Sequence, residues 1–195
     1  MGKNIDIIKV ITHADGGDAY SKSVSHYPSN EDSVAVRGYG VDDTDPETAM
    51  MQFDTVAEYY GNTGKNQYIQ FMMSFLTETA PDAKTAMDIT DHVLEPLKGK
   101  HQILMGVHKK DHVKSDYHSH DFVGTTDLET GKMLHPNNKL NYAMAQRMAD
   151  TIQKPVLLVI DKKGSQQNNT LASKSIDGNK NAFKRTFYPH KNTKD

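Results

Sequence analysis

The sequence predicts one domain with an α/β fold of the α+β kind, in which helices flank a central, mostly antiparallel sheet of five or six strands. Short β-branched segments alternate along the chain with longer segments of helical spacing. Two strand-like segments, 101–108 and 117–126, follow each other closely, which favours an antiparallel hairpin. The length of 195 residues and the hydrophobic fraction of 36% suit one such domain with a buried core.

The first half of the chain supplies two expected strands and two expected helices. Isoleucine and valine dominate residues 5–11, which we expect to form a strand ending before a glycine pair. Residues 18–27 carry apolar side chains at helical spacing before a proline, which predicts a short helix. Residues 33–39 alternate as a second strand. Residues 45–60 predict a long helix, because a proline stands near its first position and acidic residues occupy its first turn.

The second half continues the alternation. Residues 67–75 are apolar and aromatic and predict a third strand, and residues 80–97 predict a helix. The hairpin segments 101–108 and 117–126 form the fourth and fifth strands. The last expected elements are a helix over 141–152 and a fully apolar strand over 156–160.

Charge divides the chain into a body and a tail. The net charge is −2. Residues 161–195 nevertheless hold 8 lysines and arginines against 3 acidic residues, while residues 1–160 hold 15 against 22. We therefore expect a domain over 1–160 and a basic, polar tail or truncated linker over 161–195. The acidic body argues against broad coating of duplex DNA, although a narrow groove for one strand remains possible.

Composition excludes several other classes. No apolar run approaches the roughly 18 residues of a membrane span, and the N-terminus is too polar for a signal sequence. We expect a cytoplasmic protein without membrane insertion. Since the chain has no cysteine, disulfides, thiolate nucleophiles and cysteine-ligated metals are excluded. A metal would have to bind to histidine and carboxylate side chains.

Histidine is concentrated in the predicted hairpin. The chain holds 10 histidines, and five of them lie between positions 101 and 120. His118 and His120 are two apart on one strand, so their side chains share a face. His108 ends the preceding strand, and the hairpin can fold it back beside that pair. Three imidazoles would offer nitrogen ligands to a divalent cation, while Asp121 points to the opposite face.

Other interpretations of this cluster stay open. A surface hairpin can be rich in histidine without binding a metal, and His112 suits a solvated loop. The sequence lacks a serine-nucleophile elbow, a P-loop, a dinucleotide-binding glycine motif and a zincin motif. The 9 tyrosines remain as candidate nucleophiles.

Residues 106–142 (GVHKKDHVKSDYHSHDFVGTTDLETGKMLHPNNKLNY) resemble the third motif of the relaxase/mobilisation nucleases, especially MobA/MobL-like relaxases of Gram-positive conjugative and mobilisable elements. Residues 39–49 resemble the stretch after the first motif of this family, and residues 73–83 resemble its second motif. The matches follow the order of the family over about residues 20–160. As an N-terminal catalytic domain of this kind, the chain would adopt the palm of the HUH endonucleases.

The resemblance also implies roles for individual residues. His108, His118 and His120 would hold a catalytic Mn²⁺ or Mg²⁺. Tyr27 would be the nucleophile of the first motif, and Ser74 would contact DNA near the nick.

Two departures from the family pattern affect these roles. Ser119 stands between the paired histidines where a hydrophobic residue is usual. The interval from His108 to His118 is about three residues longer than in close relatives, so His112 could replace His108. Tyr20 rivals Tyr27, because the two share a helical face.

The implied activity is site- and strand-specific nicking at an origin of transfer, with a 5′-phosphotyrosyl adduct that initiates conjugative mobilisation. The partners would be single-stranded DNA with a hairpin, an accessory relaxosome protein and a coupling protein. Lys109, Lys110 and Lys114 are candidates for phosphate contacts, as is the basic tail.

Three alternatives belong to other classes. A rolling-circle replication initiator would bind a metal through the same histidines and use Tyr142 as nucleophile. A metal-stabilised module could bind a DNA hairpin without cutting it. A metal-dependent hydrolase of small phosphoesters would turn over its substrate without any adduct.

Overall fold

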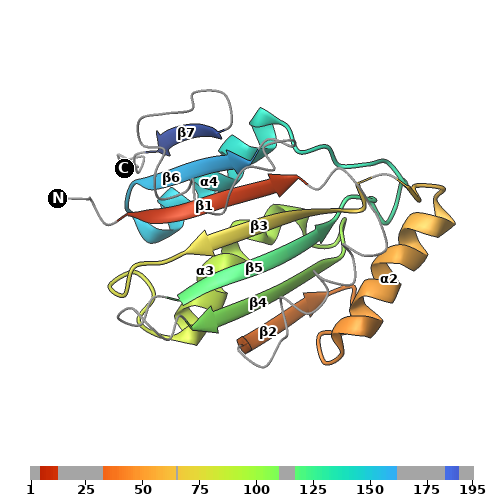
Figure 1. Ribbon diagram of the computed structural model, residues 1–195, viewed down its shortest axis with the longest axis horizontal. Coiled ribbons are helices and arrows are strands. Elements are labelled where there is room, and N and C mark those ends of the chain that lie inside the picture. Colours follow the sequence, from red (N-terminus) through yellow and green to blue (C-terminus); the bar gives the residue numbers. More distant parts are fainter. Residues whose placement is uncertain (1–4, 13–32, 65, 110–116, 162–182, 189–195) are drawn as a thin grey trace.

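The computed structural model describes residues 5–12, 33–64, 66–109, 117–161 and 183–188, which form one open sheet with helices on both faces (Figure 1). The sheet has seven strands in the order β2-β4-β5-β3-β1-β6-β7. The strands are β1 (Asp6–Thr12), β2 (Ser33–Tyr39), β3 (Tyr68–Ser74), β4 (Ile103–Lys109), β5 (Tyr117–Gly124), β6 (Val156–Asp161) and β7 (Phe183–Tyr188). The helices are α2 (Pro46–Tyr59), α3 (Ala83–Leu94) and α4 (Asn138–Ile152), with a 3₁₀ turn at Glu95–Leu97.

Strand pairing confirms the predicted, mostly antiparallel sheet. Every adjacent pair is antiparallel except β1 and β6, which are parallel. The expected hairpin is formed by β4 and β5. The helix expected over 18–27 lies outside the described residues.

The sheet is larger than expected, because β7 adds a seventh strand beside β6. This strand lies within the stretch 161–195, for which the sequence predicted only a tail. The polar residues that precede it dominate the composition of the stretch, and a six-residue strand is too short to outweigh them. Pairing with the edge of β6 supplies hydrogen bonds that composition does not reveal.

Helix ends follow local sequence signals. Asp45 and Asp82 accept hydrogen bonds from backbone N–H groups in the first turns of α2 and α3. The helix expected over 80–97 continues only as a 3₁₀ turn after Leu94, where Pro96 cannot donate a backbone hydrogen bond. Helix α4 begins three residues before the expected position 141, because the side chain of Asn137 caps it.

Each face of the sheet has its own cover. Helices α3 and α4 pack on one face over the main hydrophobic core. Helix α2 packs on the other face, where Phe53 contacts a smaller cluster that includes Leu104 and Phe122. Figure 1 shows α2 at one end of the strands, so it covers only part of this second face. No helix in the described part of the chain is long and apolar enough to cross a membrane.

Candidate functional site

The candidate site lies on the part of the second sheet face beyond α2, where His108 and His120 are themselves buried. Alternation along β4 places Met105 and Val107 in the core under α3, which directs Leu104 and His108 to the opposite face. On β5, Phe122 contacts the cluster beneath α2. His120 and His118 follow on the same face, in the direction away from α2.

The hairpin brings the three histidines together, as expected from strand spacing. His108 is the direct neighbour of His118 in the register of β4 and β5, and Gly106 lies opposite His120. The ring centres are 5.4 Å apart for His108 and His118, 5.1 Å for His108 and His120, and 5.2 Å for His118 and His120. Because Gly106 adds no side chain to this face, the imidazole of His120 has room beside β4.

Two hydrogen-bonding side chains flank the cluster. The amide nitrogen of Gln70 lies 3.2 Å from Nδ1 of His120, and both residues are buried. The hydroxyl of Ser33 lies 3.4 Å from Nε2 of His108. Burial, together with the neighbouring His118 and His108, lowers the pKa of His120 to about 3. His120 is therefore a neutral imidazole near pH 7, the form that binds metals.

The donor set suits a divalent cation. With metal–nitrogen distances of about 2.1 Å, the ring centres of histidines around one metal lie about 4.5–5 Å apart, close to the separations seen here. The rings are not yet in a liganding arrangement, since the described residues contain no group of three histidine or carboxylate side chains ready to hold a metal as they stand. To hold a metal, the three adjacent imidazoles would have to rotate until one nitrogen of each points to a common centre.

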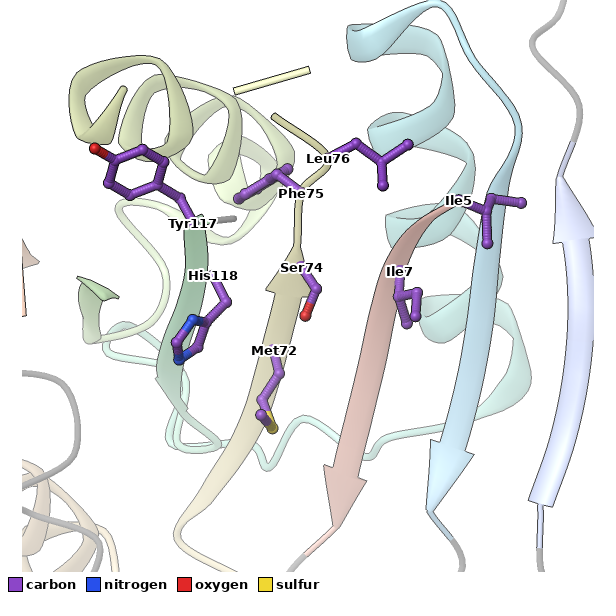
Figure 2. Close-up of a pocket in the computed structure, with 8 residues that line it drawn as sticks. All are labelled: Ile5, Ile7, Met72, Ser74, Phe75, Leu76, Tyr117 and His118. Carbon is purple, nitrogen blue, oxygen red and sulfur yellow. The ribbon is translucent and has the colours of Figure 1, made fainter. Parts of the chain in front are cut away.

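A pocket of about 410 Å³ is lined by one of the three histidines, His118. Figure 2 shows His118, Ser74, Met72 and Ile7 side by side on the neighbouring strands β5, β3 and β1. Ser74 is exposed, and its Cα is paired with that of His118. The remaining lining residues are Ile5, Phe75, Leu76 and Tyr117. The pocket thus has a polar end at His118 and Ser74 and an apolar end along β1.

Ser119 and Asp121 face the other side of the sheet, as alternation predicted. Both side chains are fully buried, and the hydroxyl of Ser119 donates a 2.7 Å hydrogen bond to Asp121. Burial raises the pKa of Asp121 well above its usual range, an effect that the hydrogen bond from Ser119 only partly offsets. The serine between the paired histidines therefore has a structural partner beneath the sheet, and Asp121 is no ligand of this site.

Several predicted site residues cannot be placed against the histidines. Tyr27, Tyr20, His112, Lys110 and Lys114 lie outside the described residues. Lys109 is exposed at the end of β4, but strand alternation directs its side chain away from the face of the histidines.

Two residues of this face were not singled out from the sequence. Gln70 interrupts the otherwise apolar inner part of β3, a signal that could have marked it. Lys9 shares its face of β1 with Ile7, because Ile8 and Val10 are buried under the helices.

Tyr142 belongs to the opposite layer. It lies on α4 and packs against the main core on the face away from the three histidines. The sheet therefore separates this tyrosine from the candidate metal ligands.

One comparison with known proteins gives a match. The family described as "Relaxase: MobA/VirD2-like, nuclease domain" matches residues 21–155, which is more than half of the chain. No curated protein matches the chain. The matched range includes all three clustered histidines and Ser74.

Proposed function

Because the chain belongs to the relaxase family, whose MobA/VirD2-like nuclease domains nick DNA, we propose that it cuts one strand at an origin of transfer by a tyrosine transesterification. The observation that carries this proposal is the convergence of His108, His118 and His120 on one face of the sheet, where His118 also lines a pocket. Relaxases are generally metal-dependent, and these imidazoles would hold Mn²⁺ or Mg²⁺.

The chemistry balances without any redox partner. The phenolate oxygen of Tyr27 attacks the phosphorus, and the bond from phosphorus to the 3′ oxygen breaks. The products are a 5′-phosphotyrosine and a free 3′-OH, which takes up a proton. A divalent cation, when bound, supplies neutralisation of charge on the scissile phosphate. The phosphodiester energy is kept in the adduct, so a later 3′-OH can reverse the step.

Residues of the open face would position the DNA. The hydroxyl of Ser74 can donate a hydrogen bond to a phosphate oxygen beside His118. The apolar end of the pocket, at Ile7 and Met72, suits an unstacked base next to the scissile phosphate. Lys9, on the same face of β1, is better directed than Lys109 to contact the backbone.

The substrate must be unpaired at the cut, because in-line attack requires a backbone that is splayed into the site. The remaining partners proposed for this chain are a DNA hairpin beside the nick, an accessory relaxosome protein and a coupling protein. Because the acidic body of the chain weakens non-specific DNA binding, we expect DNA binding to depend strongly on these partners.

The test is detection of a covalent adduct on a denaturing gel. Single-stranded oligonucleotides from the origin of transfer of its own replicon are incubated with the wild type, Tyr27→Phe and Tyr20→Phe, with Mn²⁺ or with EDTA. We expect a Mn²⁺-dependent adduct in the wild type and in Tyr20→Phe, and none in Tyr27→Phe. An adduct that survives Tyr27→Phe and disappears in Tyr20→Phe would move the nucleophile to Tyr20.

Other outcomes would replace the proposed function. An adduct lost only in Tyr142→Phe would favour a rolling-circle initiator, against the placement of Tyr142 beyond the sheet. A hairpin bound tightly without any adduct would favour a non-cutting module.

A further inference from the structure

Gln70 is a buried polar side chain in the middle of β3. It is 6% exposed, and its direct neighbour in the register of β5 is Phe122. The next residues on its face of β3 are Tyr68, under α2, and Met72, at the pocket. A buried amide needs hydrogen bonds to offset its desolvation penalty. An apolar side chain at this position would avoid that penalty, so the amide indicates a functional role.

One of the three clustered histidines is a hydrogen-bonding partner of this amide. The side-chain amide lies 3.2 Å from Nδ1 of His120, which is itself 7% exposed. A neutral imidazole carries its proton on one nitrogen and a lone pair on the other. The hydrogen bond at Nδ1 therefore decides whether Nε2 has the lone pair that a metal requires.

We propose that Gln70 is a positioning residue that holds His120 in the metal-binding tautomer. In the metal-loaded protein the amide oxygen accepts a hydrogen bond from Nδ1–H of His120, which leaves the lone pair on Nε2. The nitrogen is the nearer amide atom in the structure, and a half-turn of the amide exchanges the two atoms without moving the rest of the side chain. This inference rests on the proposed function, because it assumes a metal at the three histidines.

An amide in this place has a different effect from a carboxylate. A carboxylate on the far nitrogen makes an imidazole a more basic ligand, whereas a neutral amide fixes its orientation and tautomer without adding charge. The charge of a bound cation would then remain available to the scissile phosphate. Gln70→Glu should keep the hydrogen bond and bind the cation at least as tightly, while Gln70→Leu should lose the hydrogen bond.

The chain offers a matched control. Gln102 is also a buried glutamine, and its amide donates a 3.0 Å hydrogen bond to the backbone oxygen of Gly40. It precedes β4 at the end of the sheet remote from His108. Gln102→Leu therefore removes one buried amide hydrogen bond without touching the histidine cluster.

The experiment measures Mn²⁺ affinity without DNA, from the electron paramagnetic resonance signal of free Mn²⁺. The proteins are the wild type, Gln70→Leu, Gln70→Glu, Gln102→Leu and His118→Ala. We expect Gln70→Leu to weaken Mn²⁺ binding by about 10–100-fold, the range found when such outer partners of metal ligands are removed. Gln70→Glu should bind within a few fold of the wild type or more tightly, and Gln102→Leu should match the wild type.

The failures of the two proposals differ. If the wild type binds Mn²⁺ and His118→Ala does not, but Gln70→Leu equals the wild type, the role of Gln70 is wrong and the metal site stands. Equal losses in Gln70→Leu and Gln102→Leu would show a general effect of destabilisation and overturn the inference. If His118→Ala binds Mn²⁺ as the wild type does, the proposed metal site fails, and the inference fails with it.

A second measurement does not depend on the folding of a variant. Nitrogen NMR of histidine-labelled wild type, loaded with diamagnetic Mg²⁺, reports which ring nitrogen carries the proton. A proton on Nδ1 of His120 is expected. A proton on Nε2 instead would overturn the inference.

Discussion

The two ends of one sheet face differ sharply in what covers them. At the end under α2, Leu104, Phe122 and Tyr68 are buried, and the ring of Tyr68 makes edge contacts with Phe53 and Phe122 at centroid distances of 6.3 and 5.8 Å. At the other end, the same strands present the histidines and the exposed Ser74 beside a pocket. The strands are continuous, so the difference lies in the cover and in the side chains.

The two ends of the face have different structural roles. Phe122 and His120 are two residues apart on β5, and Leu104 and Gly106 are two residues apart on β4. The end under α2, called the packed end here, holds the strands in fixed positions. The strands are therefore also well positioned at the other end, called the open end, where the histidines lie. The partly buried His118 and the exposed Ser74 then lie on stiff strands and remain accessible to a large substrate.

The turn that follows β5 belongs to the end of the sheet face under α2. The Glu-Thr-Gly-Lys turn at 129–132 is held by Asn62, whose amide donates hydrogen bonds to Thr126 and to the backbone oxygen of Gly131. The hydroxyl of Tyr60 donates to the backbone oxygen of Leu128. These hydrogen bonds stabilise the connection after β5, at the end of the sheet away from the histidines.

The largest expected effect is the loss of nicking on removal of a histidine at the open end. His118→Ala should lower adduct formation by at least about 1000-fold, because a ligand of the proposed cation is lost. Its melting temperature should change little, since His118 is only partly buried. Adduct yield and thermal melting, measured on the same preparation, test the expected loss of nicking and the expected unchanged stability. A large fall in melting temperature would show that the open end also carries stability.

The converse change is Phe122→Ala at the packed end. It removes a fully buried ring between β5 and α2, and we expect the free energy of unfolding to fall by about 3–5 kcal/mol. Urea denaturation measures this loss. At temperatures where the variant is folded, Mn²⁺ binding should stay within a few fold of the wild type. A specific loss of Mn²⁺ affinity in the folded variant would contradict the division of roles between the ends.

The turn at the packed end gives a smaller effect with its own control. A Cβ at Gly131 would lie 2.2 Å from Cδ1 of Tyr60, and φ at Gly131 is +68°. Gly131→Ala should therefore cost about 2–4 kcal/mol of unfolding free energy. Gly61 has a φ of +69° with no atom within 4 Å of an added Cβ, so Gly61→Ala should cost only about 1–2 kcal/mol. Equal costs would indicate that Tyr60 moves away freely.

The smallest effect concerns His101, which is buried beside the packed end. Burial lowers the pKa of His101, so the unfolded chain binds its proton more readily than the folded protein does. The stabilisation of the folded protein by the uncharged, buried His101 is therefore fully present above the ordinary histidine pKa and is lost as the pH falls below it. Denaturation of the wild type and His101→Gln between pH 5 and 7.5, roughly the range around an ordinary histidine pKa, should show a flatter pH dependence in the variant. If the free energies of unfolding of the two proteins changed with pH in the same way, His101 would make no pH-dependent contribution to stability. The clustered histidines are present in both proteins and cancel in the difference.

Local sequence patterns predicted six of the seven strands, the helices α2, α3 and α4, and the shared face of the histidines. Strand alternation and the short connection between 101–108 and 117–126 are local properties, and they sufficed to place His108 beside His118. The same alternation put Asp121 on the opposite face, where it lies buried. Capping signals located α2 and α3 to within a few residues.

Only the tertiary structure decided which end of the face stays open, that β7 joins the sheet, and that Gln70 meets His120. These features depend on segments that are distant in sequence. Whether a strand edge or a face is covered is set by the packing of those segments, and periodicity within one segment does not contain that information. Gln70 and His120 are 50 positions apart, and only the pairing of β3 with β5 brings them into contact.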